Sequence, residues 1–249
     1  MLTLRQCRTL NSIAHRASKK FLFKDVANYP EDGQNDSKPD LALYRNDPRC
    51  KEVIGRDINK KSIKYIARRP YIARAAWAWM VSVGEVKTAE KHAGYLFESG
   101  GLFNNSDEGK RARAQFAKYA AEIMTRQHRT HLFTFYISGT YARLFYWDRS
   151  GCVVTTPIDL VRDPRPFYLF IFRLVHGKPD IQGYDPSVVD ASAAEIDAWR
   201  RYSTTNKYLQ KYRDRALEDE SKFPVYRVRI RIYPNPSFSD TLHSPTRRT

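Results

Sequence analysis

The sequence predicts one α/β domain of the α+β kind, with a central mixed sheet that contains a β-meander and is flanked by helices. Three observations predict this fold. The 249 residues are 42% hydrophobic and 13% aromatic, which is enough to bury a core. Three aromatic and β-branched segments follow one another between residues 131 and 156, separated by short turns that contain glycine. Segments with helical periodicity lie on both sides of them.

The first 38 residues carry the weakest pattern, and we expect a weakly ordered segment there. Within it, a short helix is expected at Leu10–Arg16 and a short strand at Phe21–Phe23. Residues 30–39 are almost entirely turn-forming and predict a loop. The globular domain is expected over residues 39–233, and its first strand is the apolar segment LALY.

Residues 57–68 predict an amphipathic helix that Asp57 caps and Pro70 stops. One side of this helix is apolar and the other side is basic. Nine basic and two acidic residues lie between Arg49 and Arg74, so much of the positive charge is concentrated here. The basic side consists of Lys60, Lys61, Lys64 and Arg68.

The elements that follow are predicted by local patterns. The stretch Trp77–Lys87 is rich in aromatic and β-branched residues, which predicts a buried strand. Ser106 is a suitable cap for a helix that runs to about Gln127, and the two acids after it favour the start of that helix. The meander strands are then expected at His131–Ser138, Tyr141–Asp148 and Cys152–Thr156.

The C-terminal part predicts three helices and an edge strand. In Val225–Tyr233, apolar residues alternate with a row of arginines, which predicts a half-exposed strand. Residues 234–249 are rich in Pro and Ser, and we expect a disordered tail. The arginine row consists of Arg227, Arg229 and Arg231. The helices are expected at Phe167–His176, from Asp185-Pro186 to beyond Trp199, and at Asn206–Leu217.

Composition limits the classes of function. The formal net charge of +16 and the pI near 9.8 make nucleic acid or another polyanion the first partner to consider. No apolar run approaches the length of a membrane span or forms a secretory signal, so no membrane partner is expected. The three scattered cysteines are typical of free thiols in a reducing compartment, which favours an intracellular protein, nuclear or cytoplasmic. Histidine spacing does not predict a zinc site.

Five polar residues follow one another in an order that suggests a catalytic site. Glu85 and Lys87 are two apart in the predicted strand and therefore share one face. If Asp40 lies alongside, two carboxylates would offer hard oxygen ligands to Mg²⁺, and the lysine would steady negative charge on a phosphodiester. Gln115 and Tyr119 lie one helical turn apart and could brace this site.

This order resembles the PD-(D/E)XK nuclease-like superfamily, including the helical Gln-x-x-x-Tyr element of its RecB-like members. The resemblance implies that Asp40 and Glu85 are metal ligands, that Lys87 is the catalytic lysine, and that Gln115 and Tyr119 support them. It implies Mg²⁺ as the cofactor if the site is intact, and otherwise none. The stretch from Asp40 to Glu85 is longer than the usual compact hairpin, and the basic helix would be the insertion.

Plainer interpretations of the same residues remain open. A Glu-Val-Lys sequence at a strand end is often an ion pair, and Pro-Asp in a loop is often a turn. An arginine row is often the wet face of an edge strand, where charge discourages aggregation. The basic helix and the arginine row are nonetheless candidates for binding nucleic acid.

A second resemblance covers more of the chain. The sequence from Gly84 through Leu160 and the segment Gln182–Pro186 resemble the region that precedes the catalytic core of fungal-type protein kinases. The characteristic pieces are His128-Arg129-Thr130, the paired strand segments and Trp147-Asp148-Arg149-Ser150-Gly151. The resemblance spans about residues 39–233 and implies a kinase-related accessory domain.

Kinase chemistry itself is not expected from these residues. ATP transfer needs a Gly-rich loop, a catalytic-loop aspartate and a metal-binding Asp-Phe-Gly, and the corresponding pieces here do not fit. We therefore expect a regulatory or binding module with a degenerate nuclease-like site, whose partner is a kinase core or another protein. It would be either a stand-alone domain or a truncated kinase gene model. The alternative is a Mg²⁺-dependent nuclease that acts on DNA or RNA.

Overall fold

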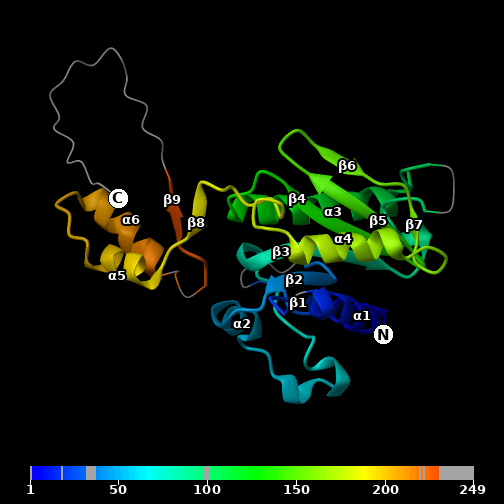
Figure 1. Cartoon of the computed structure of the whole chain (residues 1–249), viewed down its shortest axis with the longest axis horizontal. Helices are drawn as coiled ribbons and strands as arrows, with labels where there is room; N and C mark the ends of the chain where they lie inside the picture. The colour runs from blue at the N-terminus through cyan, green and yellow to red at the C-terminus, as the bar shows by residue number, and fades with distance from the viewer. Residues whose placement is uncertain are drawn as a thin grey trace, which may run out of the picture.

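The structure is a computed structural model that describes residues 2–17, 19–31, 38–64, 66–97, 101–218, 220 and 222–229. Within them, a seven-stranded mixed sheet has helices on both faces, and a separate two-stranded antiparallel sheet lies beside it (Figure 1). The strands of the sheet follow the order β1-β2-β3-β4-β5-β6, and β7 also pairs with β5. The predicted mixed sheet flanked by helices is therefore confirmed.

The bounds of the elements are as follows. The strands are β1 (Phe21–Asp25), β2 (Leu41–Arg45), β3 (Met80–Lys87), β4 (Leu132–Ser138), β5 (Tyr141–Trp147), β6 (Cys152–Val154), β7 (Ile158–Asp159), β8 (Val188–Asp190) and β9 (Tyr226–Val228). The α-helices are α1 (Leu2–Ala17), α2 (Pro48–Gly55), α3 (Asp107–Arg126), α4 (Arg165–His176), α5 (Ala193–Arg201) and α6 (Lys207–Glu218). Short 3₁₀ helices are η1 (Lys60–Ser62), η2 (Ile66–Arg68), η3 (Trp77–Trp79) and η4 (Glu90–His92).

Strand β3 has the central place in the sheet. It pairs antiparallel with β2 on one side and parallel with β4 on the other. A parallel pair cannot be joined by a tight turn, so the chain crosses over between β3 and β4, and α3 is that crossover. The meander β4-β5-β6 then continues through antiparallel pairs.

Alternate residues of the strands enter two separate cores, one on each face of the sheet. Ala42, Val83 and Tyr136 pack with Phe116 and other α3 residues on one face. On the opposite face, Leu41 and Phe135 pack with α1 and α4, and Val81 joins them because the β2–β3 register is irregular there; the helices contribute Leu10 and Ile171. The sheet is thus covered by α3 on one face and by α1 and α4 on the other (Figure 1).

Several local predictions are confirmed. Helix α3 begins after Ser106, whose side chain accepts a hydrogen bond from the backbone N–H of Gly109 at 3.0 Å. The three meander strands lie within the expected ranges, and α4 ends just before Gly177, which acts as its C-cap. In the described residues, no helix combines the length and apolar character that a membrane span requires.

The N-terminal segment contributes more regular structure than expected. Helix α1 is longer than predicted, and β1 pairs along its whole length with β2. The side-chain amide of Asn11 joins helix to strand, since it donates to the carbonyl of Phe23 and accepts from its N–H, both at 2.8 Å. The sheet therefore starts before the predicted boundary at residue 39. Residues 230–249, which include the whole predicted tail, lie outside the described residues.

The predicted helix over residues 57–68 is wrong. Its place is taken by the short 3₁₀ helices η1 and η2, with extended backbone at Ile63 directly after η1, and Ile66 is 71% exposed. An amphipathic segment forms a stable helix only where its apolar side packs against a core, and the apolar side of this segment does not. The regular helix of this insertion is α2, which begins after Asp47 and which the sequence did not predict.

The helix predicted from Asp185-Pro186 is also wrong at its start. Val188–Asp190 form β8, paired antiparallel with β9, and α5 begins only after Ser192. Ser192 and Glu195 form a capping box there, which is a stronger signal for the start of a helix than Asp185-Pro186. Of the predicted strand Val225–Tyr233, residues 225–229 are described, and Tyr226–Val228 among them form β9.

The aromatic core under α3 should dominate stability. The ring of Phe116 is 1% exposed and contacts the rings of Tyr95, Tyr136 and Phe145 at centroid distances of 6.5, 5.2 and 5.0 Å. We expect Phe116→Ala to lower the free energy of unfolding by about 3–5 kcal/mol, because it removes these contacts and leaves a cavity. Urea denaturation measures the change. The control Tyr208→Ala, at a side chain that is 77% exposed, should change it by less than about 0.5 kcal/mol.

Candidate active site

The pairing of β2 with β3 brings the two predicted carboxylates together. Leu41 pairs with Gly84, so Asp40, one residue earlier, comes alongside Glu85, one residue later. One oxygen of Asp40, Oδ2, accepts a hydrogen bond from the backbone N–H of Val86 at 2.8 Å. This bond holds the Asp40 side chain against β3 at the position that the sequence analysis required.

Lys87 completes the group from the same strand. Its Nζ donates to Oε1 of Glu85 at 2.5 Å, and the two side chains face the α3 side of the sheet. The Glu85 side chain is only 5% exposed and that of Lys87 is 26% exposed. The ammonium group therefore lies at the edge of the site, while the carboxylate lies inside it.

Helix α3 covers this group with the predicted Gln-Tyr pair. The hydroxyl of Tyr119 donates to the backbone carbonyl of Lys38 at 2.7 Å, which fixes the chain just before Asp40. The exposed Gln115 hydrogen-bonds Tyr119 from one helical turn away. All five predicted catalytic and metal residues thus lie in one place.

Electrostatics at the site follow from burial of two like charges. Burial, and next the charge of Asp40, raise the pKa of Glu85 to about 7, although Lys87 opposes the shift. Burial also raises the pKa of Asp40, against the effects of the Val86 N–H and of Lys87. For Lys87, burial lowers the pKa, but Glu85 and then Asp40 outweigh it, and the net direction is upward. The pair therefore tends to hold a proton at neutral pH.

The side chains at this site are of the type that binds a divalent cation. The second carboxylate oxygen of Glu85, Oε2, is buried and has no hydrogen-bond partner. A buried carboxylate oxygen without a partner is costly, and a hard cation bound by Glu85 and Asp40 would satisfy it. The donor set is small, because no cluster of three or more His, Cys, Asp or Glu suited to a metal occurs among the described residues. Further ligands would have to be backbone carbonyls or water.

The residues predicted to bind nucleic acid lie on elements other than those that carry this site. Arg68 is bound in an ion pair with the buried Asp25 at 2.6 Å, and Arg227 is paired with Glu195 at 2.9 Å. Lys60, Lys61 and Lys64 are exposed on and after η1, whereas Arg229 is exposed next to β9. Arg231 lies outside the described residues. Arg68 and Arg227 therefore hold parts of the fold together through ion pairs.

Comparison with known proteins adds one finding. Residues 98–218 match the model of the fungal protein kinase family. No curated protein and no solved structure matches the chain. The matched range, as we call residues 98–218, covers a little under half of the chain and supports a kinase-related domain. It does not support the nuclease resemblance.

The matched range divides the candidate site. It begins after β3, so Asp40, Glu85 and Lys87 lie outside it, whereas Gln115 and Tyr119 lie inside it. Helix α3, the meander, α4 and the segment through α6 all belong to the matched range.

The His-Arg-Thr sequence of the matched range has a structural role. Arg129 is buried, and its guanidinium donates to the carbonyls of Met80 at 3.0 Å and Gln182 at 2.7 Å. It also lies over the ring of Tyr184, 3.8 Å from the ring centroid. This arginine ties the start of β3 to the segment before β8.

One site residue was not predicted. Tyr136 pairs with Glu85 in the β3–β4 register, and its hydroxyl accepts a hydrogen bond from the N–H of Gly94 at 3.2 Å. Burial raises the pKa of Tyr136, and the charges of Glu85 and Asp40 add to the shift. The sequence signal was weak, because a tyrosine on the buried face of a strand is more often a core residue.

The protonation of Glu85 gives a test of the geometry. The carboxyl titrates near 4.5 in the unfolded chain and near 7 when folded, so folding binds a proton between these values. Stability conferred by that proton is present below the unfolded pKa and is lost as the pH rises through the folded one. We expect the free energy of unfolding of the natural chain to fall, relative to Glu85→Gln, between about pH 5 and about pH 8. Urea titrations at each pH measure it, and parallel curves would contradict burial of this carboxyl.

Proposed function

We propose that this chain is a divalent-cation-dependent phosphodiesterase that acts on DNA or RNA. The observation that carries the proposal is the convergence of Asp40, Glu85 and Lys87 at the end of β3, with one oxygen of Glu85 buried and unpartnered. Two carboxylates and a lysine at one strand end, covered by a Gln-Tyr pair, are the parts that hydrolysis of a phosphodiester requires. The positive charge of the chain favours a polyanionic substrate.

Each residue then has a role. Asp40 and Glu85 would hold Mg²⁺, which, when bound, supplies a Lewis acid and lowers the pKa of a coordinated water. Lys87, at the exposed edge of the site, stabilises the negative charge that develops on the phosphate. Tyr119 holds the carbonyl of Lys38 and thereby positions Asp40. Gln115 holds the Tyr119 hydroxyl from the solvent side.

Cleavage assays with purified protein test this proposal. With Mg²⁺ or Mn²⁺, we expect cutting of single- or double-stranded DNA or RNA, and a loss of about a hundredfold or more in rate for Lys87→Met, since the charge on the transition state is then uncompensated. Asp40→Asn should lower both the cation affinity and the rate. The matched control Lys211→Met, on the exposed α6, should keep the rate of the natural chain.

Cleavage that survives both Lys87→Met and Asp40→Asn would place the activity elsewhere or in a contaminant. Binding of Mn²⁺ that Asp40→Asn weakens, without any cleavage, would leave a cation site in a domain that is not a nuclease.

The second candidate is an accessory domain of a protein kinase, with regulatory or binding function. The match to the fungal protein kinase family over residues 98–218 favours it. In this case Asp40, Glu85 and Lys87 are a degenerate site that serves to hold β2 and β3 together.

A binding measurement tests the second candidate. We expect the chain to form a saturable complex with a separately purified catalytic core of a fungal-type protein kinase, measured by isothermal titration calorimetry. Asp40→Asn should leave that complex unchanged, because the matched range does not contain Asp40. An unrelated kinase core serves as the control, and equal binding to both cores would count against a specific accessory role.

A further inference from the structure

Helix α4 carries large apolar side chains on its solvent side as well as on its buried side. Phe167, Ile171 and Leu174 enter the core, yet Tyr168, Leu169 and Phe172 are 41%, 41% and 46% exposed. We call these last three the α4 ridge. An exposed row of large apolar residues along one helix is typical of an interaction surface.

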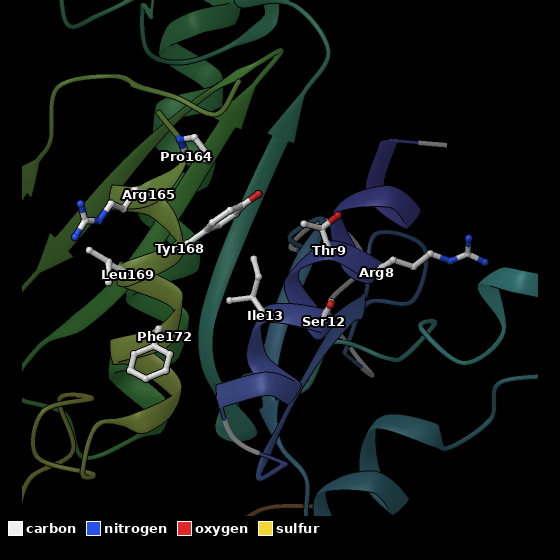
Figure 2. Close-up of a pocket in the computed structure, with 9 residues that line it drawn as sticks. All are labelled: Arg8, Thr9, Ser12, Ile13, Pro164, Arg165, Tyr168, Leu169 and Phe172. Atoms are coloured by element: carbon white, nitrogen blue, oxygen red, sulfur yellow. The ribbon is translucent and has the colours of Figure 1, made fainter. Parts of the chain in front are cut away.

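A groove runs along each side of this ridge. The first groove, of about 790 Å³, lies between α1 and α4 and contains Ile13, Pro164 and Tyr168. Figure 2 shows Ile13 and Tyr168 reaching toward each other across the space between the helices, with Phe172 further along α4. Its polar side chains are Thr9, Ser12 and the two arginines at its edges, Arg8 and Arg165.

The second groove, of about 630 Å³, lies between α4 and the meander. Its walls are largely apolar and include Phe133, Leu144 and the 57%-exposed Ile181. Leu169 of the ridge and the neighbouring Arg165 line both grooves, so the two grooves meet at these residues of α4. Together they form one apolar surface with a raised centre.

The charges at this surface are mostly positive. Arg8 and Arg165 lie at the outer edges of the first groove (Figure 2), and Arg173 lines the second. Among the described residues, no carboxylate forms an ion pair with any of these three guanidinium groups. Asp163 is the one acidic residue that lines either groove in that part of the chain. A complementary partner is therefore apolar at its centre and acidic at its rim.

The shape of the surface favours a helix as the partner. The α4 wall of the first groove extends from Pro164 to Phe172, about 12 Å of helix axis at 1.5 Å per residue. Such a wall accommodates about two turns of a second helix, whose side chains would enter the grooves on either side of the ridge. A flat lipid surface would leave the grooves unfilled, and nucleic acid offers little apolar surface to the ridge.

A second copy of the chain is a poorer fit. In a two-fold contact the same patch meets itself, so Arg8, Arg165 and Arg173 would face their own counterparts. Like charges brought together across an apolar contact oppose association.

We propose that the α4 ridge and its two grooves bind an acidic amphipathic helix of another protein. This surface lies on the face of the sheet opposite to Asp40, Glu85 and Lys87, so the proposal does not rest on the proposed enzymatic function. Apolar side chains of the partner helix fill the grooves, and its carboxylates pair with the three arginines.

The test uses a displayed library of helical peptides with fixed apolar positions and random Glu, Lys or Gln at the remaining positions. We expect the peptides enriched on the full chain to be acidic, and to lose at least about tenfold in affinity, about 1.4 kcal/mol, on Leu169→Glu. The double variant Arg165→Glu with Arg173→Glu should enrich Lys-rich peptides instead. The control Leu209→Glu, at an exposed leucine of α6, should leave affinity unchanged.

Three outcomes would overturn the proposal. The first is enrichment of peptides that are not acidic, or that are insensitive to Leu169→Glu while thermal unfolding shows both proteins folded. The second is a dimer in sedimentation equilibrium that Leu169→Glu dissociates, which assigns the ridge to a second copy of the chain. The third is binding to phosphatidylserine vesicles that depends on Leu169, which assigns the ridge to a lipid surface.

Discussion

The parallel pairing of β3 with β4 is the constraint on which the rest of the structure depends. Two parallel neighbours need a long crossover, and the chain provides one in the form of α3. Because α3 returns over the sheet, it covers the face on which Glu85 and Lys87 point outward from β3. The same crossover buries Phe116 against the meander and sets Tyr119 next to the carboxylates. The α3 crossover therefore produces both the aromatic core and the candidate site.

The buried carboxylate pair lowers the stability of the folded domain. Burial raises the pKa of both acids, the charge of Asp40 adds to the shift of Glu85, and Lys87 opposes both shifts without cancelling them. A purely structural sheet would be more stable with apolar residues at these positions, because a polar group that is only partly satisfied costs more than an apolar one. The buried carboxylate oxygen of Glu85, which has no hydrogen-bond partner, favours the proposed role of these residues in binding a cation.

The two faces of the sheet divide the candidate functions between them. The carboxylates and Lys87 lie on the α3 face, whereas the α4 ridge and its grooves lie on the other. The matched range contains α3, the meander and α4, but not β2 or β3. The proposed cation site at the end of β3 and the proposed helix-binding surface on α4 are both compatible with a kinase-related domain, since neither surface obstructs the other.

The sequence by itself determined those elements whose signals are local. Ser106 and the periodicity after it defined α3, and the Gly-containing turns at 139 and 151 defined the meander. The order of Asp40, Glu85, Lys87, Gln115 and Tyr119 also predicted their meeting, because strand and helix periodicity place them on common faces. Only the tertiary structure decided what depends on distant neighbours. Residues 57–68 have a helical pattern but no core to pack against, and Val188–Asp190 became a strand because β9 pairs with it. Likewise β1 joined the sheet, and Tyr136 the site, through pairings that no local signal encodes.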